Sequence, residues 1–490
     1  MEQIHEVLPQ KLLEAMPVSA EDWEQTPQSV QDLVIELLRR LQALEVEVAK
    51  LREQVGRNSG NSSQPPSSDG PGVVVKKEME KKHSGRKQGG QAGHPGAQRK
   101  LVAVEELKAE YDVKPARCRQ CGEELSGEDP TPYRHQVAEV PPVAVEVTEY
   151  RLHTLTCAKC GAATRAELPE GVPQGGFGSR LQATVALLSG RYHLSKRDTS
   201  GLMNDFFAVD LSLGSVPTLE QRTSEAIAQP VEAARSYVQA QGAVHQDETG
   251  WKEGIKKAWL WVAATLQVTV FMVDLYRSAD VAKRMLGLDF KGILNSDRWS
   301  AYNWLDNRQR QLCWSHLPRD FQAFVERGGE SQALGEALLV QAHQMFTWWH
   351  AVKNGTSSRA QFQEQMRPMR IEVGELLRKG TSCSHTGTAG TCRDILKREE
   401  ALWTFVDVPG VEPTNNLAER QIRPGVLWRK GSFGTQSAAG SRFVERIMTV
   451  VSTLKQQDRN VLDYLAEACE AANQGQSAPS LLPAEPIPVG

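Results

Sequence analysis

The fold of this protein is decided by residues 242–297, which read GAVHQDETGWKEGIKKAWLWVAATLQVTVFMVDLYRSADVAKRMLGLDFKGILNSD. Several runs in and after this stretch are rich in apolar and β-branched residues, and they predict short strands. These runs are residues 243–246, 258–265, 268–274, 292–295 and 310–314. A short turn separates the second run from the third and predicts a hairpin, and residues 280–288 favour a helix. The stretch therefore predicts a mixed α/β domain.

Two aspartates stand at the ends of predicted strands in this domain. Asp247 follows the first strand and Asp297 follows the fourth. Three strands, a helix and a fourth strand begin a ribonuclease H-like sheet, which can place these carboxylates side by side. A third acid from a later helix would complete a site for two Mg²⁺ ions, which favour phosphoryl transfer. The alternative role for a single aspartate at a strand end is a cap or a turn. The neighbouring Glu248 is expected on the opposite face of its strand.

Glu419 is the candidate for the third acid. It lies in the motif PTNNLAERQIRP, residues 413–424, in which the proline and threonine favour a helix start and Arg423-Pro424 a helix end or kink. Asn416, Glu419 and Arg423 share one face of that helix. Spacing alone leaves two interpretations open. One is an ordinary ion pair between Glu419 and Arg423, and the other is a site in which Glu419 binds metal, Asn416 contacts substrate and Arg423 binds phosphate.

Eight cysteines are present, and four of them form two CxxC pairs that lie 36 residues apart. The paired residues are Cys118, Cys121, Cys157 and Cys160. No signal peptide and no apolar run long enough to span a membrane is recognisable, so a reducing cytoplasm is the expected compartment. Four thiolates in two such turns predict a closed structural Zn²⁺ site, because they leave no open coordination position. Free buried cysteines are the alternative, but they leave the two matched pairs unexplained.

The N-terminal third has three different compositions. Apolar residues recur every three or four positions from Val30 to Val55, a heptad pattern that predicts a coiled coil and self-association; a single amphipathic helix is the alternative. Residues 57–72 are rich in Ser, Pro and Gly and predict a flexible linker. Residues 73–100 carry a net charge of +6 and suit contact with DNA phosphates, or serve as a solvated linker. The basic residues singled out here are Lys81, Lys82, Arg86 and Lys87.

A second basic stretch follows Glu419. Its candidate DNA-binding residues are Arg420, Arg423, Arg429 and Lys430. Trp428 and Phe433 are interleaved with them, a combination that favours DNA contact. The alternative is a solvated helix face with aromatic residues in the core.

Several of these motifs together resemble transposases of the insertion sequence sixty-six family. They are the linker at 57–72, the sequence RKQGGQAGHPG at 86–96, the two CxxC pairs, His245–Gly250, Asp297–Asn303, Cys313-Trp-Ser-His316 and Asn415–Gly434. The resemblance implies DNA transposition and a ribonuclease H-like domain. It assigns the catalytic, metal-binding acids to Asp247, Asp297 and Glu419, with two Mg²⁺ or Mn²⁺ ions. Two motifs differ from the sequence that is more usual in the family. Arg-Trp-Ser-Ala-Tyr follows Asp297, and Leu-Pro-Arg follows His316.

The domain organisation follows from these features. The expected fold class is α/β: a ribonuclease H-like domain with a helical insertion, an N-terminal coiled coil and a small zinc-binding domain. The insertion is inferred because 122 residues separate Asp297 from Glu419. His316 is either a core histidine or a site residue that orients a phosphate. The expected boundaries are 1–56 coiled coil, 57–100 basic linker, 101–173 zinc-binding domain, 174–241 helical DNA-binding or connecting domain, 242–326 and 402–473 catalytic domain, 327–401 insertion and 474–490 disordered tail.

The expected partners are transposon-end DNA, target DNA, further copies of the chain and accessory proteins of the same element. No membrane partner is expected, and the expected location is the cytoplasm of a bacterium, at the nucleoid. The main rival is a non-catalytic DNA-binding regulator. A second rival is a nuclease that hydrolyses DNA without joining it.

Overall fold

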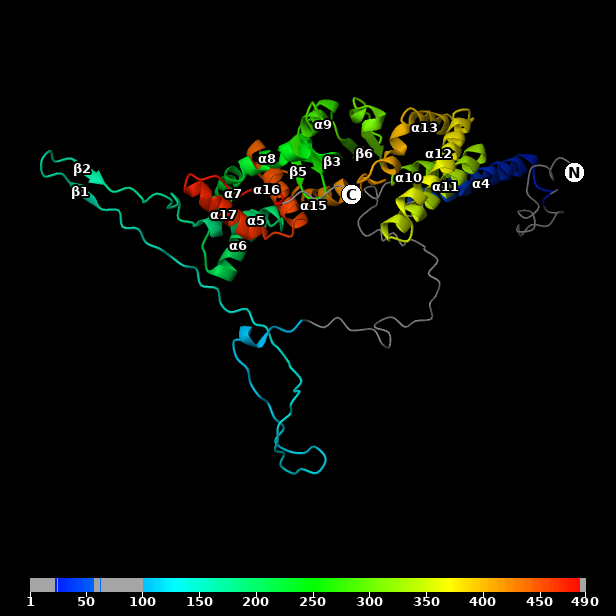
Figure 1. The fold of residues 1–490 in the computed structure, drawn as a ribbon. Helices are drawn as coiled ribbons and strands as arrows, with labels where there is room; N and C mark the ends of the chain where they lie inside the picture. Colours follow the sequence, from blue (N-terminus) through cyan, green and yellow to red (C-terminus); the bar gives the residue numbers. More distant parts are fainter. Residues whose placement is uncertain (1–22, 24, 57–61, 63–99, 485–490) are drawn as a thin grey trace.

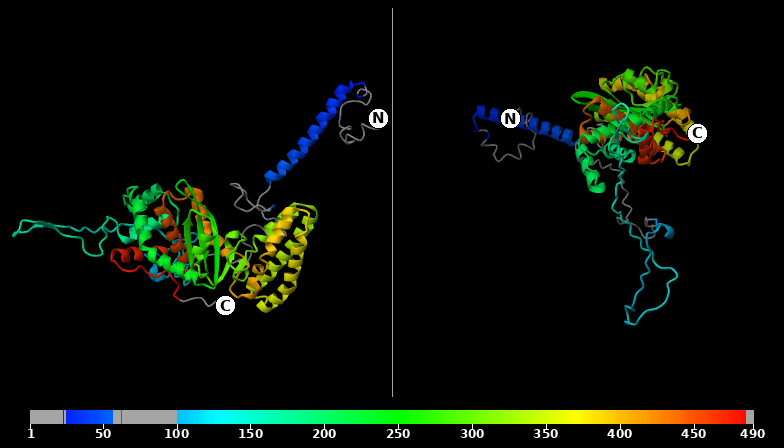
Figure 2. Two further views of the ribbon diagram at one scale, coloured as in Figure 1. Left: turned by 90° about the horizontal axis from the view of Figure 1, so that it is seen from above. Right: turned by 90° about the vertical axis from the view of Figure 1, so that its left-hand side faces the viewer.

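The computed structural model describes Trp23, residues 25–56, Ser62 and residues 100–484. A lobe built around a sheet lies beside a lobe of helices, and the helix α4 (Gln28–Gly56) projects away from both (Figures 1 and 2). The basic residues Lys81, Lys82, Arg86 and Lys87 lie outside the described residues.

The central sheet has five strands in the order β5-β4-β3-β6-β7. Their bounds are β3 (Ala243–Glu253), β4 (Lys256–Ala264), β5 (Thr269–Asp274), β6 (Ile293–Ser296) and β7 (Arg310–Leu312). The first three form an antiparallel meander that includes the predicted hairpin, whereas β6 and β7 run parallel to β3. This mixed sheet is compatible with the ribonuclease H-like domain expected from the sequence.

The strand β3 is longer than expected, and this changes the position of Asp247. The sequence predicted that Asp247 stands at the end of a strand, but it lies in the middle of β3. The reason is that β4 pairs with β3 from His245 to Glu253, whereas the pairing with β6 stops at His245. Asp247 therefore stands where the parallel neighbour ends.

The two faces of the sheet bury different sets of side chains. Along β4, Leu260 and Val262 point into one core with α15 and α16, whereas Trp261 and Ala263 point into another with α8 and α9. This alternation is the period of two expected for a strand buried on both faces. The helices of this lobe are α5 (Ser179–Gly190), α6 (Lys196–Phe207), α7 (Ser215–Ala226), α8 (Ala228–Gln239), α9 (Ala279–Leu286), α15 (Asn416–Ser432), α16 (Ala438–Gln456) and α17 (Val461–Asn473). Residues 219–240 have a helical pattern that Pro230 is predicted to kink or divide. The division is confirmed, since α7 ends at Ala226 and Pro230 lies in the first turn of α8.

Side chains of α16 cover the open edge of β5. The backbone N–H groups of Thr269, Phe271 and Val273 donate to Thr453 Oγ1, Thr449 Oγ1 and Glu445 Oε1 at 3.1, 3.0 and 2.6 Å. Residues 445, 449 and 453 are spaced by four, so they lie along one stripe of the helix. An uncovered edge would expose these donors to pairing with another strand.

The second lobe consists of the helices that separate β7 from α15. They are α10 (Leu317–Glu326), α11 (Gly329–Lys353), α12 (Arg359–Gly380), α13 (Thr386–Leu396) and α14 (Thr404–Asp407), with a short 3-10 turn at Glu400–Leu402. Two further 3-10 turns, Ser300–Tyr302 and Asn307–Gln309, lie between β6 and β7. Leu312 and Trp314 from the end of β7 join their core. The sequence predicted a loop at 379–393 and a helix at 394–405, but α13 begins inside that loop and ends at Leu396. Burial of Ala389, Cys392 and Ile395 against this core stabilises the helix despite its poor intrinsic propensity.

Residues 100–178 contain little regular structure. The alternation of apolar and polar residues at 143–155 predicts a strand, but only its end forms one, β1 (Thr154–Thr156). This strand pairs with β2 (Ala163–Arg165) in a small antiparallel hairpin, and a 3-10 turn spans Val104–Glu106. Most side chains in this stretch are exposed, so few apolar contacts support longer strands.

The two ends of the described chain differ in their packing. On α4 the heptad residues Val30, Leu37, Leu41, Leu44, Val48 and Leu51 are exposed. Part of the tail predicted to be disordered packs on the sheet lobe instead, where Leu481 is buried and Tyr464 Oη donates to the carbonyl of Pro479 at 2.9 Å. No helix among the described residues is both long and apolar enough to cross a bilayer.

Candidate active site

Asp247, Asp297 and Cys313 stand in a row across three adjacent strands. His245 pairs with Asn295 and Ser296 pairs with Leu312, so the residues that follow bring Asp247 opposite Asp297 and Asp297 opposite Cys313. Asp297 Oδ1 accepts the N–H of Trp299 at 2.9 Å, and this contact holds the turn after β6. The pair of aspartates expected from the sequence therefore meets at the end of the sheet where β6 and β7 stop.

Glu419 reaches this row because the loop before α15 is tied to two of the strands. Asn415 Nδ2 donates to the carbonyl of Gln246 in β3 at 2.8 Å. Asn295 Nδ2 of β6 donates to the carbonyls of Glu412 and Thr414 at 2.7 and 3.1 Å. These contacts place the first turn of α15, which carries Glu419, beside the aspartates.

The same loop is also fastened beyond the end of β7. The backbone N–H of Trp314 donates to the carbonyl of Pro413 at 2.9 Å, and the backbone N–H of Asn415 donates to Cys313 Sγ at 3.1 Å. Helix α15 then continues through Pro424, so the helix end that was one of the two alternatives predicted there is not formed. Packing of Ala418 and Ile422 against the sheet stabilises the continued helix.

The charges of the three acids act on one another. Burial raises the pKa of Asp247 well above its usual range, and the negative charges of Glu248, Asp297 and Glu419 add to this effect. Within the described part of the chain, no lysine or arginine forms an ion pair with Asp247 or Asp297. A cluster of carboxylates without basic partners suits hard divalent cations such as Mg²⁺, since these take oxygen ligands.

Glu248 has a different environment from its neighbour. Its side chain is only 3% exposed and pairs with Arg277 at 2.7 Å. Tyr302 Oη donates to Glu248 Oε2 at 2.9 Å. Glu248 is therefore a buried hydrogen-bond acceptor, and Tyr302 and Arg277 are its partners.

His316 lies beside Glu419. The His316 Nε2 atom is 3.5 Å from Glu419 Oε1, and both side chains are about one-third exposed, so His316 is not a core histidine. Both Glu419 and Arg423 are described, and no ion pair joins them, so the ordinary helix pair considered from the sequence is not formed. Asn416 accepts a hydrogen bond from Ser315 Oγ at 3.3 Å.

Comparison with known proteins places this geometry in a family. Residues 174–442, more than half of the chain, match the family described as Transposase IS66 family. The chain belongs to the IS66 transposase family. Residues 18–100 match a second family, whose function is unknown.

A curated relative of this IS66 family chain is an uncharacterized protein of Sinorhizobium fredii. The two are 30% identical over 245 residues, which are 45% of this chain and 45% of the relative. The chain therefore spans less than half of the length of that relative.

The basic residues of α15 in this IS66 family member fall into two groups. Arg420, Arg423 and Lys430 are exposed. Arg429 instead donates to Thr249 Oγ1 at 3.2 Å and to the carbonyl of Gly250, so it fastens α15 to β3. The sequence did not separate these roles, because the partner strand lies 180 residues away.

Arg310 of β7 lies against Asp297, and its place at the site was not predicted from the sequence. This arginine is 1% exposed, and its Nη2 atom donates to the carbonyl of Asp297 at 3.2 Å. Burial and the nearby Arg398 lower its pKa to about 10. The available signal was an arginine at the first position of a predicted strand, since a buried arginine needs several acceptors.

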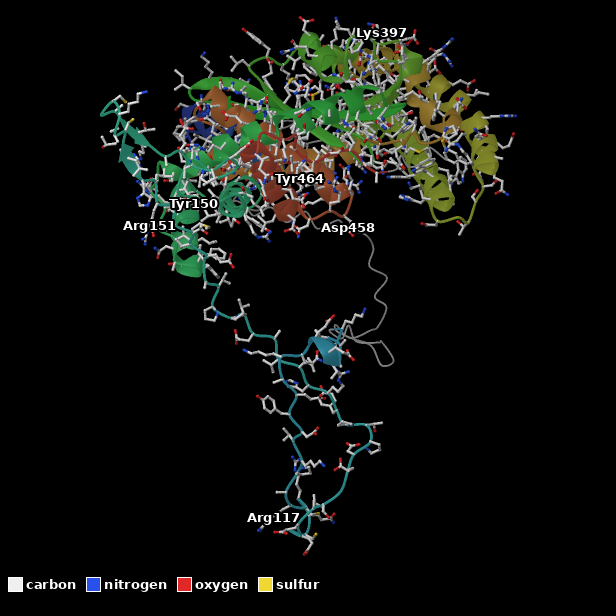
Figure 3. The ribbon with its side chains drawn as sticks, turned by 60° about the vertical axis from the view of Figure 1, so that its left-hand side comes forward. Arg117, Tyr150, Arg151, Lys397, Asp458 and Tyr464 are labelled. Carbon is white, nitrogen blue, oxygen red and sulfur yellow. The ribbon has the colours of Figure 1, made fainter. Side chains whose placement is uncertain are left out.

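The two CxxC pairs form matching turns in different places. Gly122 N–H donates to the carbonyl of Cys118 at 3.0 Å, and Gly161 N–H to that of Cys157 at 2.9 Å. Both glycines have positive φ, which L side chains rarely adopt. Figure 3 shows Arg117 at the tip of one extended loop, and Figure 1 shows the β1–β2 hairpin in a different place. Among the described residues, the four thiols are not gathered as one ligand set, and the zinc site stays a prediction.

Proposed function

We propose that this chain is a DDE-type DNA transposase, which cleaves transposon ends and joins the freed 3′-hydroxyl to target DNA. The observation that carries the proposal is the convergence of Asp247, Asp297 and Glu419 from β3, the end of β6 and α15. These acids approach closely enough for their charges to act on one another. Family membership supports the same proposal, because the family that residues 174–442 match is described as a transposase family.

The residues of the site divide the work of phosphoryl transfer. The carboxylates of Asp247, Asp297 and Glu419 would hold two Mg²⁺ or Mn²⁺ ions, which supply activation of the attacking oxygen and neutralisation of the leaving oxygen. Asn415 and Asn295 hold the strands and α15 at one spacing, which fixes the geometry of the acids. The exposed Arg420, Arg423 and Lys430 would bind DNA phosphates.

The test uses the full-length chain and a duplex that carries an end of the element, taken from the DNA flanking its gene. Asp247→Asn, Asp297→Asn and Glu419→Gln should each lower Mg²⁺-dependent cleavage by at least about a thousand-fold, while end binding is retained. Asp463→Asn is the matched control, since Asp463 is exposed on α17 and pairs with Arg180. Normal cleavage by any of the three variants would remove that residue from the triad.

The products separate this proposal from its rivals. A transposase yields strand-transfer product in which the 3′ end is joined to target DNA. Nicked DNA without joined product would indicate a nuclease. Binding without metal-dependent cleavage would indicate a regulator.

Two further parts of the chain complete the proposal. The exposed apolar residues of α4 would form a coiled coil with a second copy of the chain, because their heptad spacing suits a partner helix. Leu37→Asp together with Leu44→Asp should then lower the oligomeric state measured by light scattering.

The four cysteines of the CxxC turns would bind one structural Zn²⁺, and this requires the two loops to approach one another. Accessory proteins of the element would act with this assembly.

A further inference from the structure

A second group of possible ligands adjoins the row of acids. Cys313 Sγ, a ring nitrogen of His316 and a carboxylate oxygen of Glu419 all lie within 4.8 Å of one another. Cys313 and His316 come from a tight turn after β7, in which His316 N–H donates to the carbonyl of Cys313 at 3.2 Å. The turn directs both side chains toward Glu419, which comes from α15.

One carboxylate oxygen of Glu419 lacks a hydrogen-bond donor on the side that faces Cys313 and His316. Its Oε1 atom is buried and has no hydrogen-bond partner in the described part of the chain. The nearest basic group is His316 Nε2 at 3.5 Å, which is charged only when protonated. A buried carboxylate oxygen without a donor is unfavourable, and a bound cation would satisfy it.

The chemistry of the donors differs from that of the acid pair. A thiolate, an imidazole and a carboxylate are the ligands of Zn²⁺ and similar borderline ions, whereas Mg²⁺ takes oxygen atoms. Cys313 is 2% exposed, and its sulfur accepts the backbone N–H of Asn415 at 3.1 Å. Such a hydrogen bond orients a ligand sulfur. Burial raises the pKa of the Cys313 thiol to about 11, so a bound cation would be needed to stabilise its thiolate.

We propose that Cys313, His316 and Glu419 form a three-ligand site for Zn²⁺ or a similar borderline divalent cation, adjacent to the acid pair and sharing Glu419 with it. The site is distinct from the predicted CxxC site. Three protein ligands leave a fourth position open for water or a DNA phosphate oxygen. Because Glu419 is shared, a cation bound at this site would partly neutralise the carboxylate of a proposed catalytic acid. This consequence alone depends on the proposed function.

The test counts tightly bound Co²⁺ or Zn²⁺ per full-length chain after dialysis in excess Mg²⁺, without DNA. The wild-type chain should bind one equivalent more than Cys313→Ser and one more than His316→Gln. In the Co²⁺ form, Cys313→Ser should also lower the thiolate-to-cobalt charge-transfer absorption. Cys383→Ser is the matched control, because Cys383 is likewise buried but lies in the helical lobe, and it should keep the wild-type count.

The outcomes separate this proposal from its neighbours. Equal metal content in the wild-type chain, Cys313→Ser and His316→Gln would overturn it. His316 is one-third exposed, so His316→Gln keeps the test decisive if Cys313→Ser does not fold. Metal content is measured without cleavage. If the wild-type chain binds no additional equivalent of metal but cleaves DNA with Mg²⁺, the metal-site proposal fails. If it binds the additional equivalent but does not cleave DNA, the proposed function fails.

Discussion

Asn415 Nδ2 donates to the main-chain carbonyl of Gln246 at 2.8 Å, while its Oδ1 lies 3.3 Å from the buried ring of His245. One side chain thus joins the start of α15 to the strand that carries Asp247. The acids Asp247 and Glu419 are far apart in the sequence, and this contact is one of the few that set their spacing.

Replacement of Asn415 by alanine should misplace Glu419 without removing any acid. We expect kcat for end cleavage to fall about 10- to 100-fold while the KM for DNA stays within about twofold, because small errors in the placement of catalytic groups are costly. The loss of buried hydrogen bonds should also lower the free energy of unfolding by about 1–3 kcal/mol. Asn473→Ala is the control, since Asn473 donates to Ser179 far from the site. A fall in DNA affinity with unchanged kcat would contradict a positioning role for Asn415.

Gly425 allows α15 to approach the sheet closely. A Cβ atom at this position would lie 2.4 Å from Leu260 Cδ2, so Gly425→Ala should push the helix away from β4. We expect a loss of about 1–3 kcal/mol in unfolding free energy, as for other overpacked cores, and weaker cleavage. In Gly431→Ala, on the same helix, the added Cβ meets nothing within 4 Å. That variant should change stability by less than about 1 kcal/mol. Equal melting temperatures for the two variants would argue against tight packing at Gly425.

Ionisation of Glu445, which caps the edge strand β5, should make the free energy of unfolding depend on pH. Burial raises the pKa of Glu445 above its usual range, and the Val273 N–H and nearby arginines oppose this shift only in part. The unfolded chain therefore releases this proton at lower pH than the folded chain. The contribution of Glu445 to stability should decline as pH rises from about 4.5 through the folded pKa.

Glu445→Gln isolates this effect, because glutamine keeps an acceptor for the Val273 N–H but cannot ionise. The difference in unfolding free energy between wild type and variant, measured in denaturant from pH 4 to pH 7, should shift in favour of the variant as pH rises. A constant difference across this range would show that Glu445 titrates alike in the folded and unfolded chains.

The exposed and the anchored arginines of α15 should differ in their effect on DNA binding. Arg423 is exposed, and Arg423→Ala should reduce the slope of log affinity against log salt by about one unit if it contacts a phosphate. Arg429→Ala should mainly lower the melting temperature, since Arg429 binds Thr249 and Gly250 of β3. Salt titrations of end binding, together with thermal unfolding, distinguish the two. An unchanged salt slope for Arg423→Ala would exclude a phosphate contact at that position.

The sequence by itself was enough for the strands around Asp247 and Asp297, the hairpin of β4 and β5 and the division between α7 and α8. These features are local: strand composition, a short turn and a proline act over a few residues. The motifs around the three acids were also sufficient to suggest the family, although spacing alone left the role of Glu419 open. Family membership is now shown, whereas the zinc site and the coiled coil stay predictions.

Only the tertiary structure decided what depends on partners distant in the chain. The extension of β3 past Asp247 requires β4, the helical continuation of α15 through Pro424 requires the sheet beneath it, and the formation of α13 requires the core of the helical lobe. The approach of Glu419 to His316 and Cys313 likewise arises from backbone contacts made by residues 412–415. Packing and hydrogen bonds between distant segments outweigh local propensity at these positions, because burial stabilises an element by more than its own residues favour or oppose it.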